Sequence, residues 1–98
     1  MQHLDIFTNN NFRVLSYLYN LKDNTDTVRI TQGDMVEDLD LSLKTIGTIF
    51  RILKDNGYLI QDKKHVGRYV LTPTAIKIVE LFNKSEKIKD WLREQSIF

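Results

Sequence analysis

The chain has 98 residues, of which 42% are hydrophobic and 28% charged, a balance typical of one globular domain. It has no cysteine, which excludes disulfide bonds and thiol chemistry. No apolar run approaches the ~20 residues of a membrane span, and no signal-peptide pattern opens the chain, so we expect a cytoplasmic protein that does not enter a membrane.

The net charge of +1 conceals a strong segregation of charge along the chain. Residues 1–41 hold three basic and seven acidic residues, a net of −4, whereas residues 42–69 hold six basic and two acidic residues, a net of +4. Residues 70–98 have a net charge of +1. A basic segment attracts nucleic-acid phosphates, although an ordinary solvated face could have the same composition.

Helical periodicity begins near Asn11. The apolar spacing predicts a first helix from about Asn11 to Lys22, after a partly ordered lead-in at residues 1–9. Residues 28–30 alternate in polarity and predict a short strand. Thr31 and Asp34 are spaced as in a capping box, in which each side chain accepts a backbone N–H of the other residue. A second helix is therefore expected to begin at Thr31 and to end in a turn at residues 40–41.

The next helix is the most informative part of the chain. Ser42 is a good N-cap, because its hydroxyl can accept from an unpaired backbone N–H of the first turn. One buried stripe follows at i, i+3, i+4 and i+7: Ile46, Ile49, Phe50 and Leu53. Gly57 is expected to end the helix. The opposite face carries Lys44, Thr48 and Arg51, whose side chains suit phosphates and base edges.

The rest of the chain predicts a hairpin and two helices. Two short runs, Tyr58 to Lys63 and Arg68 to Leu71, flank a turn that contains glycine and predict an antiparallel hairpin with a basic tip. Pro73 suits the first position of the following helix. A break near residues 84–85 is expected to start a last helix, with Ser85 as its cap.

This order of elements resembles a winged helix-turn-helix domain. The match rests on Ser42-Leu43-Lys44-Thr45-Ile46, on Leu53 and on Asn56-Gly57-Tyr58-Leu59-Ile60, which are similar to the recognition helix and the start of the wing in bacterial MarR-like regulators. The resemblance covers about Thr31 to Phe82. It implies a mostly α, α+β fold over residues 1–98, with the helix-turn-helix at about 31–56, a two-stranded wing at about 58–72 and C-terminal helices at about 73–97.

The resemblance also implies a DNA-binding surface, because the second helix of such a motif enters the major groove and the wing approaches the backbone or minor groove. The candidate DNA-binding residues are Ser42, Lys44, Thr45, Thr48, Arg51, Lys54, Lys63, Lys64, His65 and Arg68. Arg51 could reach a guanine edge, hold a phosphate or pair with Asp55. Thr45 could bond a base or lie partly buried. Gly47, inside the helix, indicates either close approach to DNA or close packing on a neighbouring helix.

A homodimer is expected, with an interface built from the first and last helices. Its candidate residues are Phe12, Ile88, Trp91, Leu92 and Phe98. Full-length MarR-type regulators have longer dimerisation helices than this chain can provide. Its size is also similar to that of small centromere-binding proteins (TubR-like) from plasmid and phage partition systems, which act with a tubulin-like GTPase.

Three functions therefore remain open. The first is a homodimeric transcriptional regulator that binds specific duplex DNA, the second is a centromere-binding adaptor, and the third is a protein-interaction module. The chain has two histidines, no cluster at metal-ligand spacing, no nucleophile–base pair and no glycine-rich phosphate loop. We therefore expect no metal, no cofactor and no enzymatic activity.

Overall fold

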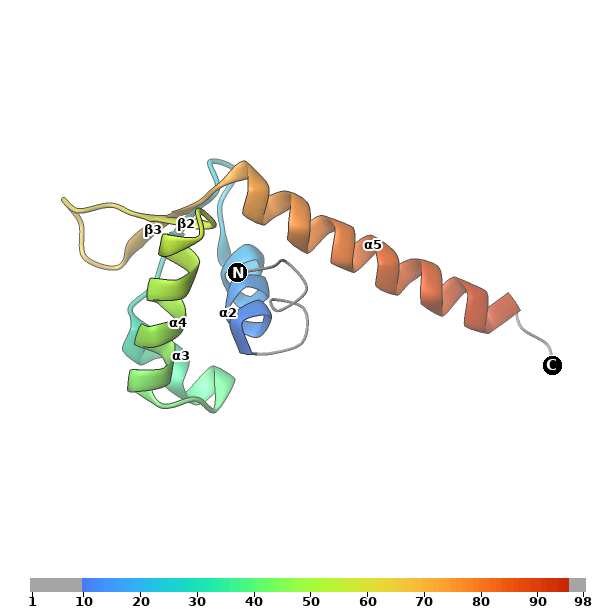
Figure 1. The fold of residues 1–98 in the computed structure, drawn as a ribbon, viewed down its shortest axis with the longest axis horizontal. Helices are drawn as coiled ribbons and strands as arrows, with labels where there is room; N and C mark the ends of the chain where they lie inside the picture. Colours follow the sequence, from blue (N-terminus) through green and yellow to red (C-terminus); the bar gives the residue numbers. More distant parts are fainter. Residues whose placement is uncertain (1–9, 96–98) are drawn as a thin grey trace.

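The computed structural model describes the backbone of residues 10–95 and the side chains of residues 10–87. The predicted lead-in at residues 1–9 lies outside this range, as does Phe98. The elements in chain order are α2 (Asn10–Leu21), β1 (Thr27–Arg29), α3 (Gln32–Leu39), α4 (Leu43–Asp55), β2 (Leu59–Gln61), β3 (Arg68–Leu71) and α5 (Pro73–Gln95). A body of short helices and a small sheet forms one end of the molecule, and α5 extends from it (Figure 1).

The sheet confirms the predicted hairpin and adds a strand to it. Strands β2 and β3 pair antiparallel, and β1 pairs antiparallel with the other edge of β3, which gives the order β1-β3-β2. Val70 is therefore the pairing partner of both Thr27 and Ile60. The predicted short strand thus becomes the third strand of the wing's sheet, and it ties the wing to the segment that leads into α3.

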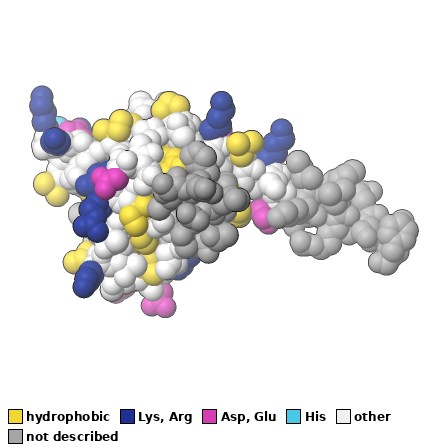
Figure 2. Space-filling view, viewed as in Figure 1, with side chains coloured by type: hydrophobic (Ala, Val, Ile, Leu, Met, Phe, Trp, Pro, Cys, Tyr) yellow, Lys and Arg dark blue, Asp and Glu magenta, His cyan; other side chains and the backbone are white. Residues whose placement is uncertain are grey.

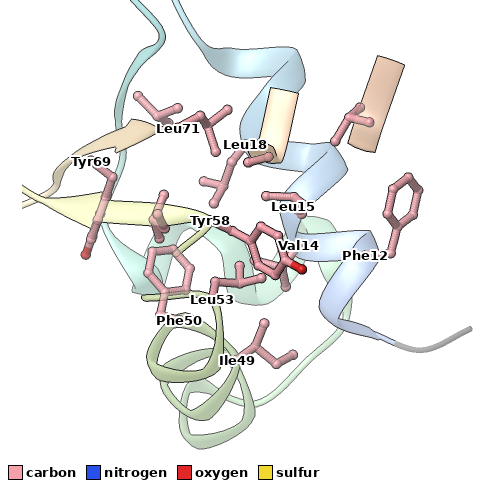
Figure 3. Close-up of a cluster of buried hydrophobic side chains, with 14 of the residues drawn as sticks. Phe12, Val14, Leu15, Leu18, Ile49, Phe50, Leu53, Tyr58, Tyr69 and Leu71 are labelled. Carbon is pink, nitrogen blue, oxygen red and sulfur yellow. The ribbon is translucent and has the colours of Figure 1, made fainter. Parts of the chain in front are cut away.

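The hydrophobic core lies where α2, α4 and the sheet meet (Figure 3), and α3 and α5 also contribute buried side chains to it. The predicted stripe of α4 is buried, since Ile46, Ile49, Phe50 and Leu53 are each at most 4% exposed. The Phe50 ring meets Tyr69 of β3 edge-on, with 4.9 Å between the ring centroids. This packing fixes which side of α4 faces inward, so the opposite side is left to solvent.

Local capping sets the two helices of the motif, as predicted. Thr31 Oγ1 accepts from the Asp34 N–H, and Asp34 Oδ2 accepts from the Thr31 N–H, both at 3.3 Å, which completes the capping box. Asp40 then takes a left-handed conformation with φ of 54°, and the chain turns. Ser42 begins α4 by accepting from the Thr45 N–H at 3.1 Å. These contacts place α3 across α4 with a turn of only three residues between them.

The predicted break at residues 84–85 is wrong. One helix, α5, runs from Pro73 to Gln95, so Ser85 is not a cap but an exposed residue within the helix. The segment contains no proline or glycine, and serine in a helix interior costs only a few tenths of a kcal/mol. A serine that could cap a helix therefore does not interrupt this one. No helix within the described residues is long and apolar enough to cross a membrane.

Phe12 lies in the core. Its side chain is 8% exposed and packs against Phe82 of α5, with 4.4 Å between the ring centroids. Tyr19, two turns later on α2, donates from its hydroxyl to Glu80 at 3.2 Å. Phe12 therefore joins α2 to the first half of α5 within one protomer, and its expected place at a dimer interface stays a prediction.

Candidate nucleic-acid interface

The solvent-facing side of α4 carries a row of polar side chains. Lys44, Thr48 and Arg51 follow one another at helical spacing and are all exposed. Among the described residues, none of these three side chains forms a hydrogen bond or an ion pair, so the predicted alternative of an Arg51–Asp55 pair is not formed. Three unengaged side chains of this kind can reach phosphates and base edges without first breaking a contact inside the protein.

The hydroxyl groups at the start of α4 form hydrogen bonds with each other and with the backbone of the same turn. Ser42 Oγ accepts from the Thr45 N–H and lies 2.9 Å from Thr45 Oγ1, with which it shares a second hydrogen bond. Thr45 is half-buried, which agrees with the predicted alternative that its side chain lies partly buried. The pair orders the N-terminus of α4, where the unpaired backbone N–H groups and the helix dipole favour an anion. Lys44 adds a positive charge at this end of the helix.

Lys54 sits at the junction of α4 and the wing. Its Nζ donates to Gln61 Oε1 of β2 at 2.9 Å. The side chain of Lys54 is exposed, but this hydrogen bond joins α4 to the wing, the two elements that are predicted to bind DNA. Lys54 is therefore better placed to fix the angle between α4 and the wing than to contact a DNA base.

The wing tip is strongly exposed and basic. Lys63, Lys64 and His65 are exposed, and Val66 at the end of the tip is 98% exposed. Asp62 shapes the tip, because its carboxylate accepts from the Lys64 N–H at 3.0 Å. Lys and Arg side chains line the edge of the molecule formed by α4 and the wing, at the end opposite the tip of α5 (Figure 2).

Arg68 differs from the other candidates on the wing. Its side chain is 34% exposed and its Nη1 lies 3.6 Å from Asp62 Oδ2. Its Nε is buried and has no hydrogen-bond partner within the described residues. The structure thus places Arg68 at the base of the wing, where it anchors the tip to the sheet, and the lysines of the tip are the more accessible cations.

Two acidic side chains of α3, Asp34 and Asp38, form hydrogen bonds within the protein. The Tyr17 hydroxyl of α2 donates to Asp38 Oδ2 at 2.5 Å, and this bond is the main reason that the pKa of Tyr17 rises to about 12. Asp34 is occupied by the capping box with Thr31. Arg13 of α2 donates to the Leu39 carbonyl at 2.7 Å, at the end of α3. Helix α2 is thus joined to the C-terminal half of α3 by two polar contacts.

The chain matches the family model described as Firmicute plasmid replication protein (RepL) over residues 1–90. It belongs to this family. No curated protein sequence matches it. Among solved structures it is similar to a mutant of S. aureus MepR bound to an oligodeoxyribonucleotide, with a TM-score of 0.72 and 23% identity over 99% of this chain and 72% of that one. The predicted winged helix-turn-helix fold is confirmed.

Two residues at this edge of the RepL-family chain are absent from the set predicted from sequence. Leu43, the first residue of α4, is 57% exposed, and an apolar side chain there suits a thymine methyl group. Gln32, the first residue of α3, lies against α4 beside Gly47. Helical spacing within α4 could have indicated Leu43, but the approach of Gln32 depends on how two helices cross, which local sequence does not reveal. Within the described residues, no group of His, Cys, Asp and Glu side chains could hold a metal ion.

Proposed function

We propose that this RepL-family protein binds duplex DNA through α4 and the wing, as a DNA-recognition component of plasmid replication. The observation that carries the proposal is the row of Lys44, Thr48 and Arg51, exposed and unengaged, beside a basic wing tip on the same edge of the molecule. In this model α4 lies in the major groove and the wing lysines contact the backbone. The family name supplies the plasmid context.

We further propose that the protein acts as a homodimer joined through α5. The helix reaches well beyond the body of the protomer (Figure 1), and Leu81 on it is 59% exposed. The predicted contacts Ile88, Trp91 and Leu92 belong to its outer half, where side chains are not described. A two-fold dimer would present two copies of α4 to successive turns of one DNA face, so each half-site would add binding energy.

Control of transcription is the second candidate function, because a protein that recognises a specific duplex site can also block or recruit other proteins there. The fold it shares with MepR, whose structure holds an oligodeoxyribonucleotide, is compatible with binding to such a site. Binding at a replication origin and binding at a promoter would use the same surface. The partition role with its tubulin-like GTPase partner, and the role as a protein-interaction module, stay predictions from the sequence.

A salt titration of DNA binding tests the proposal. On α4 and the wing tip, four cations per protomer are exposed and lack a side-chain partner among the described residues: Lys44, Arg51, Lys63 and Lys64. Each phosphate neutralised contributes about −0.9 to the slope of log affinity against log salt. We therefore expect a slope of roughly −3.5 per protomer, or roughly −7 for a dimer, when a fluorescent duplex is titrated by anisotropy.

The matched control is a protein in which Lys77 and Lys84, exposed on α5 away from α4 and the wing, are changed to alanine. This variant has the same loss of charge as a Lys63→Ala, Lys64→Ala double variant. Only the wing variant should flatten the slope, by about 2 per protomer. An affinity that is independent of salt, or an equal effect of the two double variants, would contradict DNA binding by this edge.

A further inference from the structure

Gly47 stands in the middle of α4, where glycine is the wrong residue for a stable helix. Glycine costs about 1 kcal/mol relative to alanine at an interior helical position. Gly47 lies one turn after Leu43 and one turn before Arg51, so it borders the exposed row of α4. Helix stability therefore does not explain why position 47 is a glycine, and another reason is needed.

The space left by Gly47 is occupied from the neighbouring helix. A Cβ added at Gly47 would lie 3.3 Å from Gln32 Oε1, and no other atom outside its own helix and its chain neighbours comes within 4 Å. Gln32 is half-buried there. Its amide makes no hydrogen bond with any described residue, although it has two N–H donors and an acceptor oxygen.

Among the described residues, the buried side-chain polar atom without a partner is Arg68 Nε, so the amide of Gln32 is open to solvent and can donate to a ligand without first breaking a bond inside the protein. The first residue of α3 is also the part of this motif that a duplex approaches, since the first helix of a helix-turn-helix crosses the DNA backbone. Asp34, two residues later, accepts from the Thr31 N–H, so its carboxylate is engaged within the first turn of α3.

We propose that Gln32 is a DNA-backbone contact: its side-chain amide donates to a phosphate of the duplex bound by α4, and Gly47 leaves the room in which that amide lies. The proposal rests on the proposed DNA binding and adds to it a neutral contact from α3. Because Gln32 carries no charge, the contact strengthens binding without releasing a counterion. Gly47 is thus a positioning residue that acts through Gln32.

Four variants test this assignment: Gln32→Ala, Gln32→Glu, Gly47→Ala and the double variant Gln32→Ala with Gly47→Ala. Asn83→Ala, which removes an exposed amide from α5, is the matched control. The probes are a mixed-sequence duplex of about two helical turns and a duplex selected by the wild-type protein from a random pool. Affinity is measured by anisotropy at several salt concentrations, and folding by thermal unfolding.

We expect Gln32→Ala to weaken binding to both duplexes by about 3- to 10-fold with an unchanged salt slope. Gln32→Glu should lose more, because it places a negative charge beside a phosphate, although an acidic residue in the first turn favours the helix. Gly47→Ala should unfold at the same or a higher temperature and still bind more weakly. The double variant should bind no more weakly than Gln32→Ala, since Gly47 acts through that side chain.

Other results overturn the proposal. Unchanged binding by Gln32→Ala, while the wild type and Asn83→Ala bind, removes Gln32 from the interface and leaves the proposed function intact. A loss confined to the selected duplex makes Gln32 a base contact instead of a backbone contact. Additive losses in the double variant mean that Gly47 faces the DNA directly. If the wild type and Asn83→Ala bind neither duplex, the proposed function itself fails.

Discussion

Phe12→Ala distinguishes a core role from an interface role at one position. The wild-type side chain is 8% exposed and its ring packs at a tilt against Phe82, with 4.4 Å between the ring centroids, so its removal leaves a cavity between α2 and α5. Truncation of a buried phenylalanine costs about 3–5 kcal/mol. Phe12 lies near the end of the core, which puts the expected loss at about 3 kcal/mol. For a domain of this size, that lowers the unfolding temperature by roughly 12–24 °C.

The assay is thermal unfolding, followed by circular dichroism at two protein concentrations that differ about a hundredfold. A core residue lowers the unfolding temperature by the same amount at both concentrations, whereas a pure dimer contact matters only where the dimer is populated. Leu81→Ala is the control, because Leu81 is 59% exposed on α5 and its loss should change protomer stability by less than about 0.5 kcal/mol. A loss for Phe12→Ala that disappears on dilution would refute the core assignment.

Three further predictions concern the DNA surface, pH and assembly. Arg51→Ala should cost about 1–3 kcal/mol on a selected duplex and relax its sequence preference, whereas Lys64→Ala should weaken selected and random duplexes equally; equal losses for Arg51→Ala would make it a phosphate contact. Tyr17→Phe should cost about 1 kcal/mol, because it removes the bond to Asp38. The Tyr17 pKa is raised from 10.0 to about 12, so the extra free energy of unfolding of the wild type over Tyr17→Phe is complete below pH 10 and disappears as the pH rises to 12. Denaturant unfolding of both proteins at pH 8 and pH 12 measures this difference, and a difference that persists at pH 12 would contradict the prediction. Trp91→Glu should weaken self-association and specific DNA binding together, and sedimentation at micromolar concentration should show monomers; an unchanged dimer would exclude Trp91 from the interface.

Local signals in the sequence predicted most of the fold. Thr31 with Asp34 and Ser42 with Thr45 satisfy the backbone within their own first turns, so a few neighbouring residues determine where α3 and α4 begin. Pro73 indicated the start of α5 for a different local reason, because its missing N–H and fixed φ suit the first position of a helix. The stripe on α4 has one possible inward face, and its burial left the Lys44–Arg51 row outside.

Contacts between distant segments were beyond these local signals. The pairing of β1 with β3 joins residues about forty positions apart and follows from sheet geometry. The bond from Lys54 to Gln61 and the approach of Gln32 to Gly47 depend on how elements cross. Phe12 has the same apolar character in a core as in a dimer interface, so only its contact with Phe82 shows that it belongs to the protomer's core. Ser85 has the chemistry of a cap, but the adjacent segment contains nothing that ends a helix.

The strand order has a consequence for how the chain folds as it is synthesised. Strand β3 lies in the centre of the sheet and is the last of the three strands to be synthesised. Strand β1 therefore has no pairing strand until Arg68–Leu71 has been translated. Closing the long loop between β1 and β3 has an entropic cost that helix formation in α2, α3 and α4 does not have. The helices can therefore form early, while the outer face of β1 and the base of the future wing stay unpaired. A nascent chain that ends within the wing has α4 but no completed sheet beside it, and the buried residues Ala75, Ile78 and Val79 of α5 are made later still.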